Sequence, residues 1–306
     1  MDMRIIMTSV NELDECGQPM NITFNYKRNK TKAVLTLKGI IDGVLADVIL
    51  NDIEIIFLRA WSDNDAFDFN DGDFIDIKEQ VKDILEDGII SSSEQKDMQQ
   101  MLNDILEYSS KIEDPHNESI NYLLGFLSGI SADDILCDEE IFALRDNLSQ
   151  KADYVKQWPA NALKARLDLV LKDGIIDDDE RHDLMELIKA VSGQTFLKTG
   201  LAYGMSADFS TSSDTFPKLD GLNICFTGRF LSGSRSKQRE IAKKLGANIV
   251  KGINQKLDVL VLGSLASKDW KYTSYGNKIF DVLNNRTKGS TTEIVNEEQW
   301  NDLTCM

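Results

Sequence analysis

The chain has 306 residues, of which 42% are hydrophobic and 28% are charged, and its formal net charge is −17. Such a composition is typical of globular proteins with two or three domains and a substantial core. The sequence has no run of about 18 apolar residues and no apolar leader, which predicts a cytoplasmic protein without a transmembrane helix or signal peptide. Its four cysteines are scattered without a C-x-x-C pair, which argues against a disulfide framework and a zinc site.

The charge is divided unevenly along the chain. Residues 1–215 carry 20 basic and 42 acidic side chains, a net charge of −22, whereas residues 216–306 carry 14 and 9, a net charge of +5. An acidic surface repels nucleic acid and a basic surface attracts it. We therefore expect the two parts to bind different partners, or each other.

An internal duplication organises the first two-thirds of the chain, after a polar lead-in over residues 1–30. When the sequence is shifted by 86 positions, residues 37–106 align with residues 123–192 without a gap and are identical at 21 of 70 positions. A constant offset of this kind is the signature of a repeated structural unit. The sequence predicts two helical repeats, over residues 31–108 and 117–192.

Each repeat contains two turns in which a Glu follows an Asp after seven positions. The pairs are Asp47/Glu54, Asp87/Glu94, Asp133/Glu140 and Asp173/Glu180. Three residues before the Glu stand Asn51, Ser91, Cys137 and Asp177. Three of these four are good N-cap residues, so the Glu is expected to complete a capping box that begins the next helix. Apolar residues at helical spacing flank every turn, which predicts four helical hairpins, about eight helices in all. Their expected core residues include Trp61, Phe126, Phe142 and Leu144.

Two of these turns also match the second half of a calcium-binding EF-hand loop, because a Gly follows Asp87 and Asp173. Leu85, Leu169 and Leu171 occupy positions where such a loop needs its first oxygen ligands. Leucine cannot ligate a cation that requires six or more oxygens, so we favour capped turns over calcium sites. The repeated Asp-Gly-Ile turns between paired helices resemble those of TerB-like helical domains.

No motif of a known catalytic site is found. His116 and His182 are the only histidines, and neither has partners at the spacing of a metal site or a catalytic triad. Residues 63–76 are rich in carboxylates at irregular spacing, which is typical of a solvated connection and offers an acidic surface to a basic partner. The sequence predicts a non-enzymatic protein without a metal or cofactor.

The composition changes after the second repeat. Residues 193–216 contain three glycines and a Ser/Thr-rich run, and they show no helical period. Such a pattern predicts a flexible or surface-draped linker.

Residues 217–306 alternate short apolar strands with helices. Strands are expected at 223–227, 248–250, 259–262 and 292–295, and helices at 236–245, 277–284 and 297–303. This alternation predicts a small parallel sheet with helices on its faces. The predicted fold class is therefore multi-domain, with an all-α tandem duplicated helical domain followed by a small α/β domain with a parallel sheet.

The end of the first predicted strand has the chemistry of a phosphate site. The strand stops at Thr227-Gly228 and is followed by a helix, so that a hydroxyl, backbone N–H groups and the positive helix end meet there. Lys268 follows the next apolar strand and is expected to supply a cation. The adjacent basic residues are Arg229, Arg235, Lys237 and Arg239.

This segment resembles the BRCT module, in the form that bacterial DNA repair and replication proteins carry, including exonucleases and NAD-dependent DNA ligases. The resemblance rests on Thr227-Gly228, Gly246-Ala247, Asp258–Gly263, Ser267-Lys268 and Trp300. It implies that Trp300 is buried against the sheet. It also implies a phosphate pocket made by Thr227, Gly228 and Lys268, with Trp270 close enough to narrow the pocket or stack on a base.

We expect a non-enzymatic DNA-associated adaptor. Its BRCT-like module would bind DNA ends or backbone phosphate, and the acidic repeats over residues 31–192 would recruit a protein partner or oligomerise. The alternative is a protein–protein scaffold or dimerisation module without nucleic-acid binding. Sequence-specific DNA binding is not expected, since nothing in the chain has the pattern of a base-reading helix.

Overall fold

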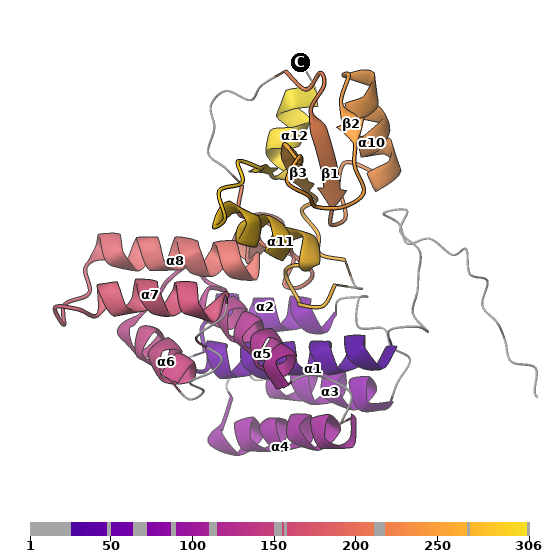
Figure 1. The fold of residues 1–306 in the computed structure, drawn as a ribbon. Coiled ribbons are helices and arrows are strands. Elements are labelled where there is room, and N and C mark those ends of the chain that lie inside the picture. The colour runs from indigo at the N-terminus through magenta and orange to yellow at the C-terminus, as the bar shows by residue number, and fades with distance from the viewer. Residues whose placement is uncertain are drawn as a thin grey trace, which may run out of the picture. The chain divides into compact units, whose positions relative to one another are not determined.

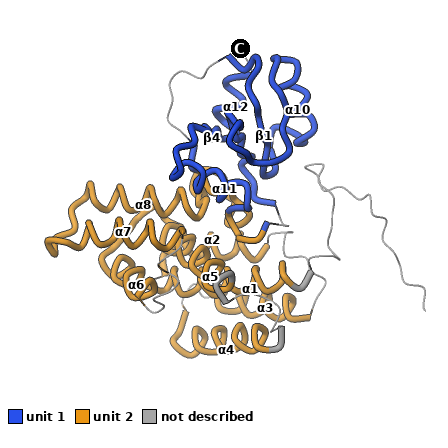
Figure 2. The backbone as a smooth tube through the Cα atoms, viewed as in Figure 1, with its two compact units in different colours: residues 1–26, 209–270, 275–306 blue, residues 27–208, 271–274 orange. Residues whose placement is uncertain are grey.

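The structure is a computed structural model that describes residues 26–47, 50–63, 72–86, 90–109, 115–149, 155, 158–210, 218–267 and 270–304 (Figure 1). The chain forms two compact units, which are described separately below (Figure 2). The helical unit consists of residues 27–208 and the short segment 271–274. The α/β unit comprises the described residues of the ranges 209–270 and 275–304.

The described part of the helical unit contains the eight predicted helices and one short additional helix. The first repeat supplies α1 (Tyr26–Val44), α2 (Asp52–Ser62), α3 (Gly72–Ile84) and α4 (Ser92–Ser109). The second repeat supplies α5 (Pro115–Ile130), α6 (Asp138–Ser149), α7 (Ala160–Val170) and α8 (Asp178–Ser192), followed by α9 (Phe196–Thr199). Because α2 and α6 begin 86 positions apart, as do α4 and α8, the duplication in the sequence is also one in the structure.

The two repeats meet through four glycines on α1 and α5. A Cβ placed on Gly39 would lie 2.1 Å from the carbonyl oxygen of Tyr122, and a Cβ on Gly125 would lie 2.0 Å from that of Thr36. Gly43 and Gly129 lie against each other in the same way. Only glycine allows two helix backbones to approach so closely. This contact was not predicted from the sequence, although the two Gly-x-x-x-Gly patterns stand at the same 86-residue offset.

The predicted capping boxes are present. At the start of α2, Asn51 Oδ1 accepts hydrogen bonds from two backbone N–H groups, and Asn51 N donates to Glu54 Oε2 at 2.9 Å. Asp177 and Glu180 form the same reciprocal pair at α8. The prediction that these turns are capped is therefore confirmed where the structure describes them. Asp87 lies outside the described residues.

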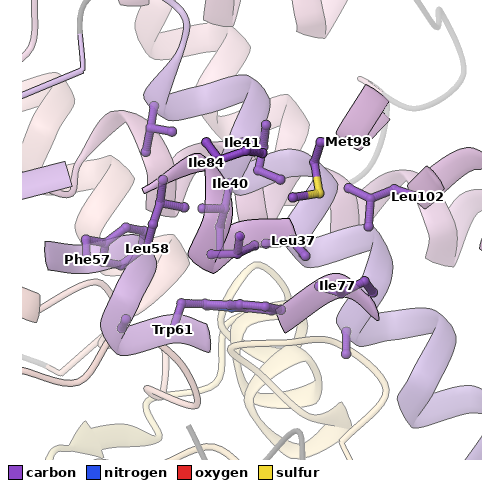
Figure 3. Packing of buried hydrophobic residues seen from close by; sticks show 14 of the residues in the cluster. Leu37, Ile40, Ile41, Phe57, Leu58, Trp61, Ile77, Ile84, Met98 and Leu102 are labelled. Carbon is purple, nitrogen blue, oxygen red and sulfur yellow. The ribbon is translucent and has the colours of Figure 1, made fainter. Parts of the chain in front are cut away.

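Apolar side chains of α1 to α4 form the core of the first repeat (Figure 3). Trp61, Phe126 and Leu144 are buried, as predicted. The expectation for Phe142 is wrong, because its side chain is 40% exposed and carries the guanidinium of Arg145 over its ring. The buried face of α6 contains Ile141 and Leu144, so Phe142 lies at the edge of this face.

Residues 193–210 are not a loose linker. Phe196 packs edge to face against Phe57 at 5.3 Å between ring centroids, and Tyr203 lies similarly against Trp61 at 6.3 Å. Ala207 is 1% exposed. The segment lacks a helical period, but its apolar side chains complete the helical core, so the expectation of a flexible or surface-draped segment is wrong for this stretch. Residues 211–217 lie outside the described part of the chain.

The segment Lys271–Ser274 is an integral part of the helical unit. Asn121 Oδ1 of α5 accepts hydrogen bonds from the backbone N–H of Thr273 at 3.0 Å and from its hydroxyl at 3.1 Å. The hydroxyl of Ser274 donates to the carbonyl oxygen of Val191 at 2.8 Å. Asn121 and Ser274 are completely buried. Four residues from the last third of the sequence thus belong to the helical unit, and Tyr272 and Ser274 are buried there.

The α/β unit is built on the predicted parallel sheet. Its strands are β1 (Asn223–Thr227), β2 (Asn248–Ile249), β3 (Val259–Leu262) and β4 (Glu293–Val295), and all pairs are parallel in the order β2-β1-β3-β4. The helices are α10 (Arg235–Lys244), α11 (Asn277–Arg286) and α12 (Glu297–Thr304). Trp300 of α12 is fully buried and packs edge to face on Phe226 of β1, as the resemblance implied.

Candidate phosphate site and acidic groove

A tight turn closes the carboxyl end of β1. Gly228 has φ +81°, and a Cβ at this position would lie 2.9 Å from the carbonyl oxygen of Gly263. A glycine is therefore required both by the backbone conformation and by the close approach of the loop after β3. Arg229 and Leu265 exchange backbone hydrogen bonds at 2.7 and 3.1 Å, which joins the two loops beyond the strand ends.

A lysine that was not among the predicted site residues lies at this end of the sheet. Lys278 stands in the first turn of α11, and its Nζ lies 3.3 Å from both the carbonyl oxygen of Phe226 and Sγ of Cys225. Alternate residues of a strand face the same side, so Thr227 shares a sheet face with Cys225. The ammonium group of Lys278 thus lies at the residue before Thr227, near the turn at Gly228, while Thr227 itself is buried with 4% of its surface exposed.

The expected cation, Lys268, lies outside the described residues. The helix after β3 begins at Asn277, so the lysine of its first turn is Lys278. This residue could be found from the sequence, since the helix was predicted to begin at residue 277. Trp270 lies over the N-terminus of α11, where a Cβ on Gly276 would be 2.8 Å from its indole ring.

Two of the predicted basic residues are used within the fold. Arg235 donates from Nε and Nη2 to the carbonyl oxygen of Gly228, at 3.2 and 2.7 Å, and so braces the turn. Burial lowers the pKa of Arg235, and the neighbouring Arg239 adds to this effect. Arg229 donates from Nε to the carbonyl oxygen of Ala266 at 3.1 Å. Their charges still raise the local potential, but these donors are already occupied.

The outward side of α10 carries the accessible cations. Lys237, Lys243 and Lys244 are exposed, and Arg239 is half-buried, whereas Gln238 points inward. A basic helix face of this kind attracts phosphates without reading bases.

A buried polar chain holds the loops that shape this region. Trp300 Nε1 donates to Gln238 Oε1 at 2.9 Å, and Gln238 donates to the hydroxyl of Ser232 at 3.0 Å. Glu297 accepts from the backbone N–H and the hydroxyl of Ser232 at 2.7 Å each, and from the backbone N–H of Ser264 at 2.9 Å. The loops after β1 and after β3 are therefore tied to the start of α12 through one carboxylate.

Known proteins resemble this part of the chain. Residues 214–288 match the family described as the BRCA1 C Terminus (BRCT) domain. This part of the chain is a BRCT domain. A DNA ligase of Sulfurihydrogenibium sp. (strain YO3AOP1) is 35% identical over 83 residues, which are 27% of this chain and 10% of the ligase. No solved structure matches the chain.

The chain spans only a tenth of the length of that ligase. A BRCT domain by itself is a non-catalytic module of DNA repair or of protein–protein interaction. In the part of the chain that the structure describes, no helix is long and apolar enough to cross a bilayer. The resemblance of the repeats to TerB-like domains stays a prediction.

The helical unit has a separate acidic groove of about 490 Å³ between α3 and α4. Its lining residues are Asp73, Asp76, Asp97, Gln100, Met101, Asp104 and Ile105. Four carboxylates and the apolar side chains of Met101 and Ile105 line it together, and Lys30 pairs with Asp73 at 2.5 Å. The groove thus combines negative charge with apolar surface.

The second repeat provides an internal comparison for this groove. The positions that correspond to Asp73, Asp76 and Asp104 hold Pro159, Ala162 and Ala190. Asp183, which corresponds to Asp97, forms an ion pair with Arg166. The acidic lining is therefore specific to the first repeat and is not required by the repeated fold.

Proposed function

We propose that this chain is a non-enzymatic adaptor associated with DNA. Its BRCT domain binds a terminal or backbone phosphate at the end of β1, and its acidic helical repeats recruit a second protein. The observation that carries the first part is the position of Lys278, whose Nζ donates to the carbonyl oxygen of Phe226 and to Sγ of Cys225 at 3.3 Å each and keeps its third N–H donor for a phosphate oxygen.

The chemistry of this point suits a phosphate. A hydroxyl, the N-terminus of α11 and a lysine ammonium group supply the donors and positive charge that phosphate oxygens require. The exposed lysines of α10 would extend the contact along a nucleic-acid backbone. Because nothing in the domain has the pattern of base recognition, binding would depend on phosphate and salt and little on sequence.

The test is a titration of the full chain with a DNA duplex, with and without a 5′-phosphate, at low and physiological salt. We expect tighter binding to the phosphorylated duplex. Lys278→Met should reduce this preference about tenfold or more, because a charge-assisted hydrogen bond contributes about 1.5–3 kcal/mol. Lys288→Met, which removes an exposed lysine with the same change of charge, is the matched control. Failure to bind either duplex at low salt would refute the DNA-binding part.

The acidic groove favours recruitment of a protein partner, which is also the function that remains if DNA binding fails. A basic amphipathic helix would complement both the carboxylates and the apolar lining residues Met101 and Ile105. A lysine-rich amphipathic peptide is a suitable probe. Replacing Asp76, Asp97 and Asp104 by Asn should weaken its binding about tenfold, because each exposed ion pair contributes up to about 1 kcal/mol.

The matched control replaces Glu79, Glu86 and Glu107 by Gln, because these exposed carboxylates lie outside the groove lining and give the same change of net charge. Equal weakening in both variants would show non-specific attraction to an acidic protein and would contradict the groove as the binding surface.

A further inference from the structure

The joint between the two repeats contains four carboxyl groups. The turn after α1 carries Asp47 and leads to Glu54 of α2, and the corresponding turn after α5 carries Asp133 and leads to Glu140 of α6. The close packing of α1 on α5 brings these turns together. Asn51 Nδ2 of the first repeat donates to Asp133 Oδ2 of the second at 2.9 Å.

Two of these carboxyl groups are almost completely buried. Glu54 is 3% exposed and Glu140 is 5% exposed. Each accepts the backbone N–H of its own cap residue, Asn51 at 2.9 Å and Cys137 at 2.8 Å. These hydrogen bonds use one oxygen of each carboxyl group and can be accepted by either the neutral or the ionised form.

The neighbouring charges do not neutralise the pair. Among the described cations, Arg181 of α8 pairs with Asp138 and Lys189 of α8 pairs with Asp134, and both of these aspartates are themselves exposed neighbours of the joint. Glu139 lies beside Cys137 and adds a further negative charge. Protonation is therefore the available way to remove the negative charge of the buried pair.

Burial raises the pKa of Glu54 to about 8 and that of Glu140 to about 7. The nearby Asp133 and Asp47 raise both pKa values further, whereas the hydrogen bonds from the cap residues oppose the shift. Both groups thus change charge in a range where ordinary glutamates are already ionised.

We propose that this joint is a pH-sensitive lock between the two helical repeats. With Glu54 and Glu140 protonated, the two turns remain closed against each other. When both carboxyl groups ionise, the like charges of Asp47, Glu54, Asp133 and Glu140 repel across the joint and loosen it. The lock lies within the helical unit and does not depend on which ligand the BRCT domain binds.

The sign of the effect follows from linkage. A carboxyl group that binds its proton more tightly in the folded state gives stability that is complete below its unfolded pKa of about 4.5 and is lost as the pH rises through the folded value. Each group should lower the folding equilibrium constant by up to about tenfold per pH unit above about pH 4.5. For Glu140 this loss should end near pH 7, and for Glu54 near pH 8.

The direct test is a carbon-13 NMR titration of the glutamate side-chain carboxyl groups in the full chain. We expect two resonances with midpoints near pH 7 and 8, of which Glu54→Gln and Glu140→Gln each remove one. Gln can also complete a capping box, so both variants keep the cap. Titration of every glutamate below about pH 6 would overturn the proposal.

The locking role is tested by the pH dependence of unfolding and by hydrogen exchange. Between pH 5 and 7, the folding equilibrium constant of the wild type should decrease as the pH rises. The E54Q/E140Q double variant should show little of this decrease. The control E79Q/E107Q, which neutralises two exposed glutamates, should keep it. The amides of Ala46 and Ala132, which donate to the carbonyl oxygens of Gly43 and Gly129 in the two turns, should exchange at least tenfold faster at pH 8 than at pH 6 in the wild type alone, after correction for intrinsic exchange. Equal behaviour of the two double variants would overturn the proposal in favour of general acidic repulsion.

Discussion

Gly43 of α1 lies against Gly129 of α5, the residue at the same position of the other repeat, and a Cβ on Gly43 would be 3.0 Å from Cα of Gly129. Equivalent residues thus meet each other, as they do at a two-fold interface between identical subunits. The duplicated chain builds within one molecule the kind of contact that a symmetric dimer makes between two.

This contact predicts the effect of adding a methyl group. In Gly125→Ala, the new Cβ would lie 2.0 Å from the carbonyl oxygen of Thr36, so the helices must separate. We expect a loss of about 1–3 kcal/mol in the free energy of unfolding, despite the better helix propensity of Ala. Gly72→Ala on α3 is the control, because no atom lies within 4 Å of its Cβ. The urea midpoint should fall in the first variant and stay equal or rise in the second.

The carboxylate of Glu297 should respond to pH in the opposite sense to Glu54 and Glu140. Burial alone would raise the pKa of Glu297, but hydrogen bonds from Ser264 and Ser232 outweigh it and hold the pKa below its ordinary value. Its contribution to stability is therefore present above about pH 4.5 and is lost as the pH falls through the folded pKa. Glu297→Gln should cost about 1.5–3 kcal/mol at pH 7. Thermal unfolding at pH 7 and pH 4 checks this, and an unchanged difference between variant and wild type at pH 4 would contradict it.

Arg235 should support the turn at the end of β1 through its two hydrogen bonds to Gly228. Arg235→Met is expected to destabilise the BRCT domain by about 1–3 kcal/mol, because it leaves a part-buried carbonyl oxygen without these donors. Lysine should not restore the loss, because it lacks the planar fork of guanidinium. Lys243→Met, at an exposed position of the same helix, is the control. The melting temperatures of the variants report the result, and equal values for Arg235→Met and the control would count against the role.

Asn121 should be needed for the segment Lys271–Ser274 to hold its place in the helical unit. Asn121→Ala removes the acceptor of two hydrogen bonds from Thr273 at a completely buried site. We expect a cost of about 1–3 kcal/mol in the urea unfolding of the full chain. Asn103→Ala, whose side chain accepts an exposed hydrogen bond from Lys38, should change little. If both changes have the same small effect, the segment contributes nothing to the stability of the unit.

The contacts of this segment also determine whether a fragment can replace the full chain in experiments. A fragment that begins at residue 217 would carry residues 271–274 without Asn121 and Val191, to which they are hydrogen-bonded. Experiments on DNA binding therefore require the full chain.

Local patterns in the sequence predicted most of the described secondary structure, although not the short helix α9. Strands β1 and β3 have the predicted bounds, since each is a short apolar run that ends at a turn. The caps at Asn51 and Asp177 were also predicted, because a capping box involves residues only three positions apart. DNA binding and the recruitment of a protein partner stay predictions, because neither can be derived from such local patterns.

The sequence by itself determined the duplication, the helical and α/β classes, the BRCT resemblance and the division of charge. Tertiary structure alone decided how residues far apart combine. It buried Glu54 and Glu140 at one joint, joined residues 271–274 to the helical unit, left Phe142 exposed and placed the ammonium group of Lys278 at the carbonyl oxygen of Phe226. The physical reason is that hydrophobic periodicity and helix capping act over one or two helical turns. Burial, pKa values and the distances between charged groups depend instead on which surfaces pack together.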